Sequence, residues 1–416
     1  MQSSVKFSRI VKVLRDKAPS GLPHNNLSRF TQSFFKVCYW WLAKKGDIDA
    51  QYSLGELFWM DAPYQNRGGL SRNLPKAIKW FRRAGDQGHI FAQIRIGNLL
   101  LLWVDEDGSD SEAFGWFLKA SKLGDPGSQW QIGQMYEDGV GVTRDIEKAA
   151  HWYLKAAEGD GNFWNKPFNR EAMYEVAIAT SIPQNALFVI SESAFKIAKM
   201  YDRGEGLPRS DSNALKYYKL AAKYCSSVKI KAQKEIASKY NLGRGVPRDY
   251  CIAFDWYRKA AEGGETFSMY MLGRFFFYGK GTSTDYCESA KWIMKAQKEG
   301  NDKRAGDYEL GFMYYYGKGV QQDISRAFSL LSIEAERGNP NAFLQLGWMY
   351  ANGHGTRTNI VNAYILFRLA LEYGVIEVAK SYIKNFQSKL NEAQITDAQC
   401  RIQRWFDIGE LMLEDD

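Results

Sequence analysis

Apolar residues recur along the chain with the spacing of amphipathic helices, and the helical pattern itself repeats. Each repeat contains an aliphatic residue followed by a small one, with a large apolar side chain three residues after the small one. The eight aliphatic positions are Leu54, Ile96, Ile132, Ile197, Ile236, Leu272, Leu310 and Leu346. Six of their seven spacings lie between 36 and 42 residues, and the remaining one is 65. A period in this range is typical of arrays of short helix pairs.

A second apolar landmark and a glycine-rich turn complete each repeat. The landmark residues are Trp80, Trp116, Trp152, Tyr217, Trp256, Trp292, Leu330 and Leu366. Gly-x-Gly turns begin at Gly139, Gly204, Gly243, Gly279, Gly317 and Gly353, and in five of the six an Asp or Asn follows four residues after the second glycine. Glycine ends a helix readily because it adopts the left-handed conformation without a steric cost. Asp and Asn are good N-caps for the next helix, so the pattern predicts antiparallel helix pairs of about 36 residues.

The segment from Ser128 to Gly159 follows A-x-x-x-L-G-x-x-Y-x-x-G-x-G-V-x-x-D-x-x-K-A-x-x-W-Y-x-K-A-A-E-x-G almost literally. This pattern resembles the Sel1-like repeat family, a relative of the tetratricopeptide repeats, and the resemblance extends over about residues 40–374. It implies an all-α fold, specifically a right-handed α-solenoid of antiparallel helix hairpins.

The spacing also predicts the domain organisation. We expect a basic helical segment at residues 1–46, repeats 1–3 at 47–160, an insert or degenerate repeat at 161–190, repeats 4–8 at 191–374, and capping helices at 375–416. The insert accounts for the 65-residue spacing. Its content of Phe163, Trp164 and Phe168 is too apolar for a free linker, so we expect it to be an ordered loop or a degenerate helix pair.

The charge of the protein is concentrated at the N-terminus. The whole chain carries 55 basic and 47 acidic residues, and residues 1–46 alone hold the entire excess of +8. A basic protein often binds nucleic acid, but here the remaining 370 residues are neutral, which argues against a nucleic-acid partner. Phe7, Ile10, Val11 and Leu14 form an amphipathic stripe. A helix there either packs on the body or makes a weak contact with a membrane surface through residues 1–20.

The same segment lacks the apolar core of a secretory signal, and no apolar run approaches the ~20 residues of a membrane-spanning helix. Five cysteines without a CxxC motif fit a reducing compartment. We therefore expect a cytoplasmic protein, or a periplasmic one if a presequence had been removed.

Signatures of catalysis and cofactor binding are scarce. The sequence contains no complete GxGxxG, no phosphate-binding GxxxxGK[ST] loop and no HExxH, and its four histidines have no zinc-ligand spacing with the cysteines. Ser193 to Lys196 matches S-x-x-K but falls within a predicted repeat helix. We expect no metal, no cofactor and no enzymatic activity, with β-lactam hydrolysis as a remote alternative.

The first helices of repeats 6, 7 and 8 carry a second stripe, rich in aromatics, beside the packing face. We predict partner binding by Tyr270, Arg274, Phe277, Tyr278, Tyr308, Phe312, Tyr315, Tyr316 and Trp348. Aromatic residues and Arg are enriched at binding hot spots. The resemblance to tetratricopeptide-like hairpins implies that these positions line the concave face. The alternative is that tight curvature buries the stripe between neighbouring repeats.

The resemblance also implies a function. It indicates a non-enzymatic scaffold that binds another protein on the concave face of the solenoid. The leading specific role is that of a bacterial immunity protein that neutralises a cognate secreted toxin by occlusion, with a lipase effector as one candidate toxin. The alternative is a general adaptor for signalling or complex assembly.

Overall fold

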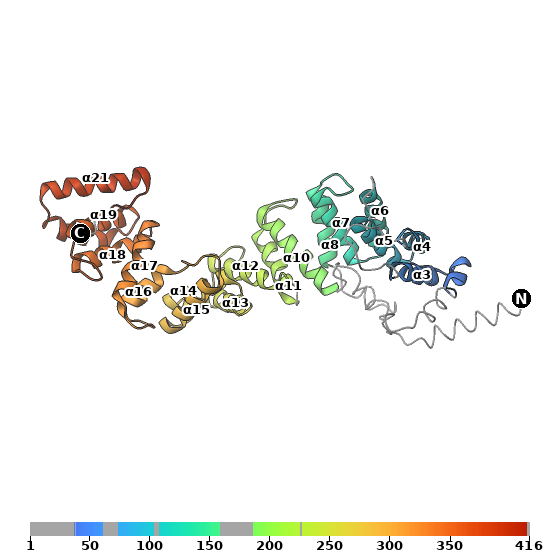
Figure 1. Cartoon of the computed structure of the whole chain (residues 1–416), viewed down its shortest axis with the longest axis horizontal. Coiled ribbons are helices and arrows are strands. Elements are labelled where there is room, and N and C mark those ends of the chain that lie inside the picture. Colours follow the sequence, from blue (N-terminus) through green and yellow to red (C-terminus); the bar gives the residue numbers. More distant parts are fainter. Residues whose placement is uncertain are drawn as a thin grey trace, which may run out of the picture. The chain divides into compact units, whose positions relative to one another are not determined.

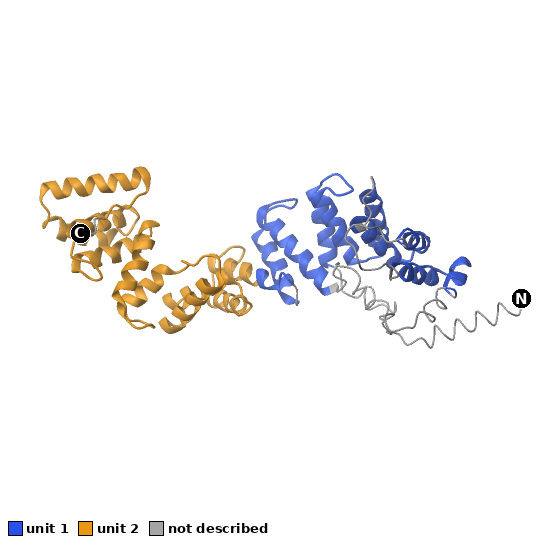
Figure 2. Cartoon of the chain, in the orientation of Figure 1, with its two compact units in different colours: residues 1–232 blue, residues 233–416 orange. Residues whose placement is uncertain are grey.

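The computed structural model describes residues 37, 39–60, 74–103, 108–158, 186–224 and 227–413. Within these ranges the chain forms helices joined by turns, and no strand occurs (Figure 1). The chain divides into two compact units, unit 1 at residues 1–232 and unit 2 at residues 233–416 (Figure 2). The predicted N-terminal amphipathic helix and most of the 161–190 insert lie outside the described residues.

Unit 1 is built from antiparallel helix pairs. The pairs are α3 (Ile48–Met60) with α4 (Leu74–Asp86), α5 (Ile90–Trp103) with α6 (Ser109–Lys122), α7 (Pro126–Asp138) with α8 (Ile146–Glu158), and α10 (Ala186–Arg203) with α11 (Asp211–Lys223). Each pair packs closely, and successive pairs contact each other, as α4 contacts α5. α12 (Lys229–Leu242) crosses the boundary between the two units.

Unit 2 continues the same pattern. α13 (Tyr250–Glu262) is followed by three pairs: α14 (Thr266–Tyr278) with α15 (Tyr286–Glu299), α16 (Asp307–Tyr316) with α17 (Ile324–Glu336), and α18 (Pro340–Asn352) with α19 (Ile360–Glu372). Two further helices close the unit, α20 (Ile376–Gln387) and α21 (Glu392–Ile408), and both pack on α19 (Figure 1). The stacked pairs confirm the all-α solenoid of helix hairpins expected from the sequence.

The small residue of each repeat permits close contact within a hairpin. A Cβ atom on Gly133 would lie 2.7 Å from the ring of Tyr153, and one on Gly273 would lie 2.6 Å from Ile293. The partner side chain is the residue directly after the second landmark, which the sequence analysis did not single out. The prediction that the small residue lets two helices approach is confirmed.

The two glycines of each turn have different tasks. Gly279 ends α14 with a φ of 64° and donates its N–H to the carbonyl of Phe275, as the sequence predicts. Gly281, with a φ of 67°, lies against the start of the preceding hairpin's second helix, and a Cβ atom there would fall far inside van der Waals contact with the Tyr250 carbonyl. The second glycine is therefore an inter-repeat contact, which only the structure reveals.

The predicted N-caps are present in the structure. In all five repeats where the sequence places an Asp or Asn after the turn, the side-chain oxygen of that residue accepts a hydrogen bond from the backbone N–H three residues later. The caps are Asp145, Asp249, Asp285, Asp323 and Asn359, with donor–acceptor distances of 2.9–3.0 Å. Each cap satisfies an N–H that would otherwise lack an acceptor at a helix start.

Candidate partner-binding surface of unit 2

The nine predicted binding residues all lie in unit 2, on the first helices of three consecutive hairpins, α14, α16 and α18. Three of them are exposed: Tyr278 by 41%, Tyr316 by 46% and Trp348 by 36%. Four are half-buried, namely Tyr270, Arg274, Tyr308 and Phe312. The remaining two, Phe277 and Tyr315, are buried.

Phe277 and Tyr315 belong to the hydrophobic core of unit 2. The ring of Phe277 lies 5.3 Å from that of Phe312 and 5.5 Å from that of Tyr286, centroid to centroid. At these two positions the structure corrects the expectation of accessible side chains, because neighbouring hairpins cover them. Their hydrophobic contacts support the stripe from beneath.

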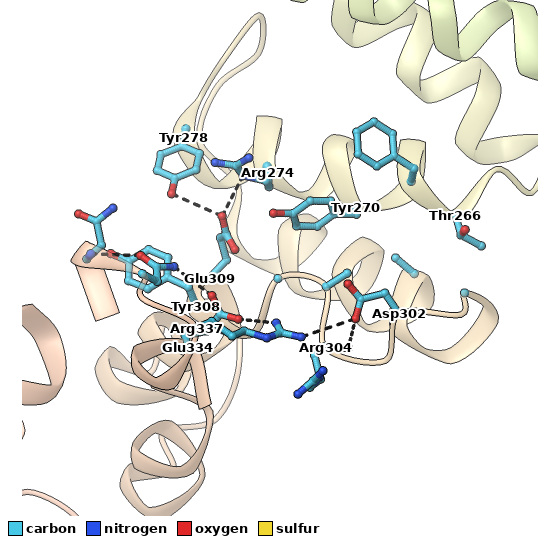
Figure 3. A pocket seen from close by; sticks show the side chains of 17 residues that line it. Thr266, Tyr270, Arg274, Tyr278, Asp302, Arg304, Tyr308, Glu309, Glu334 and Arg337 are labelled. Carbon is cyan, nitrogen blue, oxygen red and sulfur yellow. Dashed lines mark hydrogen bonds and ion pairs between the residues drawn. The ribbon is translucent and has the colours of Figure 1, made fainter. Parts of the chain in front are cut away.

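Four of the nine residues converge on one pocket of about 460 Å³ (Figure 3). Tyr270, Arg274 and Tyr278 come from α14, and Tyr308 comes from the first turn of α16. The opposite wall is formed by the 300–306 loop and the turn between α17 and α18. This wall and the base add charged residues that the sequence analysis missed, namely Asp302, Arg304, Glu309, Glu334 and Arg337.

The pocket exists because one inter-hairpin connection is longer than its neighbours. Seven residues, 300–306, join α15 to α16, whereas three join α13 to α14 and α17 to α18. α16 has only 10 residues, against 13 for α14 and α18. The missing helical turn leaves space beside α14. A sequence signal was present, since the spacing from Leu272 to Leu310 is 38 residues rather than 36.

An ion pair connects the two helices at the base of the pocket. Arg274 Nε lies 2.9 Å from Glu309 Oε1, and the Tyr278 hydroxyl lies 3.4 Å from the same oxygen (Figure 3). The Arg274 guanidinium also lies 5.6 Å from the ring centroid of Tyr270 and 5.5 Å from that of Tyr278. Burial raises the pKa of Glu309, and the nearby Arg274 opposes that rise. The pair therefore holds Arg274 between two aromatic rings.

Unit 1 contains an ion pair at the equivalent repeat positions, but there the acidic residue lies on the earlier helix and the arginine on the later one. Glu56 directly follows Gly55, and Arg95 stands two residues before Gly97. Arg274 and Glu309 occupy the corresponding positions relative to Gly273 and Gly311. Arg95 Nε lies 2.7 Å from Glu56 Oε1, and the Arg95 side chain is 1% exposed, against 36% for Arg274. Comparison of the residues beside the recurring small position in successive repeats could therefore have identified Glu309 as the partner of Arg274 from the sequence.

The opposite wall of the pocket has its own polar network. Arg337 Nη1 donates to Glu334 Oε1 at 2.7 Å, and Asn339 Nδ2 donates to Glu334 Oε2 at 3.0 Å. Asp302 accepts the backbone N–H of Arg304 at 3.0 Å and lies 4.0 Å from Arg337 Nη2. The three hydrogen bonds order the turn and the loop separately, and the 4.0 Å ion pair between Asp302 and Arg337 is the contact that joins the two.

The remaining predicted residues form a second group outside the pocket lining. The rings of Phe312 and Tyr316 lie 4.6 Å apart, and Trp348 lies 5.3 Å from Tyr382, centroid to centroid. Lys318, in the turn after α16, lies 5.5 Å from the Tyr316 ring. The exposed aromatics of α16 and α18 thus provide a contact surface separate from the pocket.

The structure offers no support for the S-x-x-K motif as a catalytic centre. Ser193 is fully buried, and the Lys196 ammonium donates to Glu137 Oε2 at 2.8 Å. Among the residues that the structure describes, no cluster of three His, Cys, Asp or Glu side chains has the arrangement of a metal site. A search of the same ranges finds no helix that combines the length and apolarity needed to span a bilayer.

Comparison with known families and structures gives one family match. The model described as Sel1 repeat matches eight segments, at residues 48–89, 90–125, 126–161, 191–223, 230–265, 266–301, 305–339 and 342–374. No curated protein matches the chain.

Two solved structures are similar over most of the chain. A Sel1 repeat protein from Oxalobacter formigenes is 26% identical, with a TM-score of 0.50, and the match covers 87% of this chain and 91% of that one. A protective antigen of uropathogenic Escherichia coli with an SLR fold is 22% identical, with a TM-score of 0.31 and coverage of 89% and 94%.

Proposed function

The chain belongs to the Sel1 repeat family, whose members are generally non-enzymatic protein-interaction scaffolds, and we propose that it binds its partner protein through α14, α16 and α18 of unit 2. The observation that carries this proposal is the pocket walled by Tyr270, Arg274, Tyr278 and Tyr308. Its volume of about 460 Å³ is within the range of pockets that enclose a ligand group.

The chemistry of this surface suits a polypeptide. Aromatic rings provide large contact areas at a small entropic cost, and Arg supplies several hydrogen-bond donors, so both are enriched at binding hot spots. Tyr316 and Trp348 add a second exposed contact on the following hairpins. An extended partner segment would insert one side chain into the pocket and lie across these two rings, on the face that the family resemblance implies to be concave.

As the specific role we propose neutralisation of a cognate secreted toxin, in which the bound scaffold covers the toxin's active site or substrate entrance. The family resemblance implies this role as one of those that Sel1-like proteins fill. A general adaptor for signalling or complex assembly is the alternative, and it uses the same surface. The two roles differ in outcome, because only neutralisation abolishes an activity of the partner.

The binding surface can be tested by substitution. After affinity capture and identification of a partner, Tyr278→Ala and Trp348→Ala are each expected to weaken binding by ~1–3 kcal/mol, measured by isothermal titration calorimetry. Phe406→Ala is the matched control, since Phe406 is a 50% exposed aromatic on α21. Melting temperatures should stay near that of the unmodified protein in all three variants.

Two results would contradict the proposal. One is equal weakening by Phe406→Ala; the other is unchanged binding after both stripe substitutions. For the specific role, the purified partner's own activity is measured with increasing scaffold. Full inhibition at one equivalent supports neutralisation, and unaffected activity leaves the adaptor role.

A further inference from the structure

The hydrogen-bonding capacity of the pocket is unevenly used. Its three carboxylates all have donors from within the chain. Glu309 forms an ion pair with Arg274 and accepts a long hydrogen bond from the Tyr278 hydroxyl, and Glu334 accepts through both oxygens. Asp302 accepts a backbone N–H. A cationic partner group would therefore compete with donors that the chain already supplies.

The donors, in contrast, are only partly used. The Arg304 guanidinium is exposed and makes no hydrogen bond or ion pair with any residue in the described ranges. Arg337 uses Nη1 for Glu334, while its Nη2 is 4.0 Å from Asp302, too far for a hydrogen bond. The hydroxyls of Tyr270 and Tyr308 also have no hydrogen-bond partner among the described side chains. The pocket therefore offers two guanidinium groups and two phenols to an acceptor.

We propose that the pocket binds the carboxylate of an Asp or Glu side chain within the partner protein, with Arg304 and Arg337 as its ligands and Tyr270 and Tyr308 as the aromatic walls. This inference rests on the proposed function and specifies the chemistry of the partner segment. Guanidinium groups match a planar carboxylate by paired N–H donors. A doubly charged phosphate is less suitable, because the three acidic side chains already in the pocket would repel its second charge more strongly.

The position of the two arginines supports this assignment. Arg304 belongs to the lengthened 300–306 connection, and Arg337 caps the C-terminal end of α17, so both belong to the wall opposite α14. In Figure 3 the Arg337 guanidinium lies between Glu334 and Asp302, and the exposed Arg304 side chain extends outward from the loop, where it is free to turn toward a bound group. The same lengthened connection that opens the pocket thus also supplies one of the unused guanidinium groups. The other two connections that lead from one hairpin of unit 2 to the next, from α13 to α14 and from α17 to α18, have only three residues each.

The test uses the full chain and fluorescein-labelled 12-residue peptides, blocked at both ends, in fluorescence anisotropy titrations. One peptide carries Asp-Glu pairs in a Gly-Ser background, and matched peptides carry Asn-Gln, Lys-Arg or phosphoserine instead. A further Asn-Gln peptide has a free C-terminal carboxylate. We expect the Asp-Glu peptide to bind at least about tenfold more tightly than all the others, and its binding to weaken with added salt.

Variants separate the pocket from the basic residues elsewhere in the chain. Arg304→Gln alone, and together with Arg337→Gln, should weaken binding of the Asp-Glu peptide by at least about fivefold. Arg258→Gln on α13, whose side chain is 48% exposed, is the matched control and should change binding less than about twofold. The Arg304 side chain is exposed and makes no hydrogen bond or ion pair in the described ranges, so the single variant is expected to fold normally.

Three results would overturn the inference. They are equal binding of the Asp-Glu and Asn-Gln peptides, tighter binding of any of the other peptides, and loss of affinity in Arg258→Gln as large as in Arg304→Gln. These outcomes are distinguishable from failure of the proposed function. Suppose that Tyr278→Ala and Trp348→Ala weaken binding of the captured partner while the peptides show no preference for acidic residues. The proposed binding surface then stands, and only the assignment of a carboxylate to the pocket is refuted.

Discussion

Replacing Gly281 by alanine tests how neighbouring repeats are joined. Gly281 has a φ of 67°, and its α-carbon faces the Tyr250 carbonyl and the Cys251 N–H at the start of α13. Both contacts are backbone atoms of a capped helix, so neither can move as a flexible side chain could. The added methyl group must therefore push the turn after α14 away from the preceding hairpin.

The expected cost has two parts. A non-glycine residue in the left-handed region costs about 1–2 kcal/mol, and overpacking at a rigid contact adds about 1–3 kcal/mol. Gly281→Ala should therefore destabilise unit 2 by about 2–5 kcal/mol. Gly264→Ala is the matched control, because Gly264 has a φ of 95° but no atom within 4 Å of an added Cβ. The control should show only the first part, about 1–2 kcal/mol.

The free energies of unfolding are measured by urea denaturation followed through tryptophan fluorescence. Amide hydrogen exchange then locates the change, since nearest-neighbour coupling in repeat proteins predicts faster exchange in both α13 and α14. A cost for Gly281→Ala no larger than that for Gly264→Ala would refute the reasoning. So would faster exchange confined to the turn itself.

Two further predictions concern charged groups. Burial, with a smaller contribution from Glu334, raises the pKa of Asp307 to about 6, so the native state binds more protons than the unfolded state between about pH 4 and 6 and becomes less stable as the pH rises through that window. Asp307→Asn should therefore stabilise unit 2 more at pH 7.5 than at pH 4.5 in urea denaturation, and a pH-independent difference would contradict this. Glu56→Gln, which leaves the buried Arg95 without its counter-charge, should cost about 3 kcal/mol. Glu112→Gln, in an exposed pair with Arg82, should cost less than about 1 kcal/mol, and equal costs in thermal or urea unfolding would show that burial does not determine the strength of the pair.

The sequence predicts the helices of this protein well because the signals are local. The period of about 36 residues, the glycine that ends the first helix and the Asp or Asn that caps the second all act within a few residues of the backbone they control. The structure confirms the caps at every predicted position and the left-handed glycine at the end of α14. It also confirms the close helix contact at Gly273.

The candidate site is predicted less completely because it depends on how hairpins pack against each other. A helical stripe groups Phe277 with Tyr278, but burial separates them, since the following hairpin covers the first ring and leaves the second exposed by 41%. Glu309 is missed because an acidic residue has no place in an aromatic stripe; its role depends on Arg274 of the preceding hairpin.

The amino-acid sequence by itself determines that the chain forms a series of helix hairpins, because repeat length, turns and caps are properties of short segments. Only the tertiary structure decides that the second turn glycine is an inter-repeat contact and that two additional residues before Leu310 open a pocket. The physical reason is that both features depend on distances between neighbouring hairpins. Those distances are set by side-chain packing between segments more than 30 residues apart in the sequence.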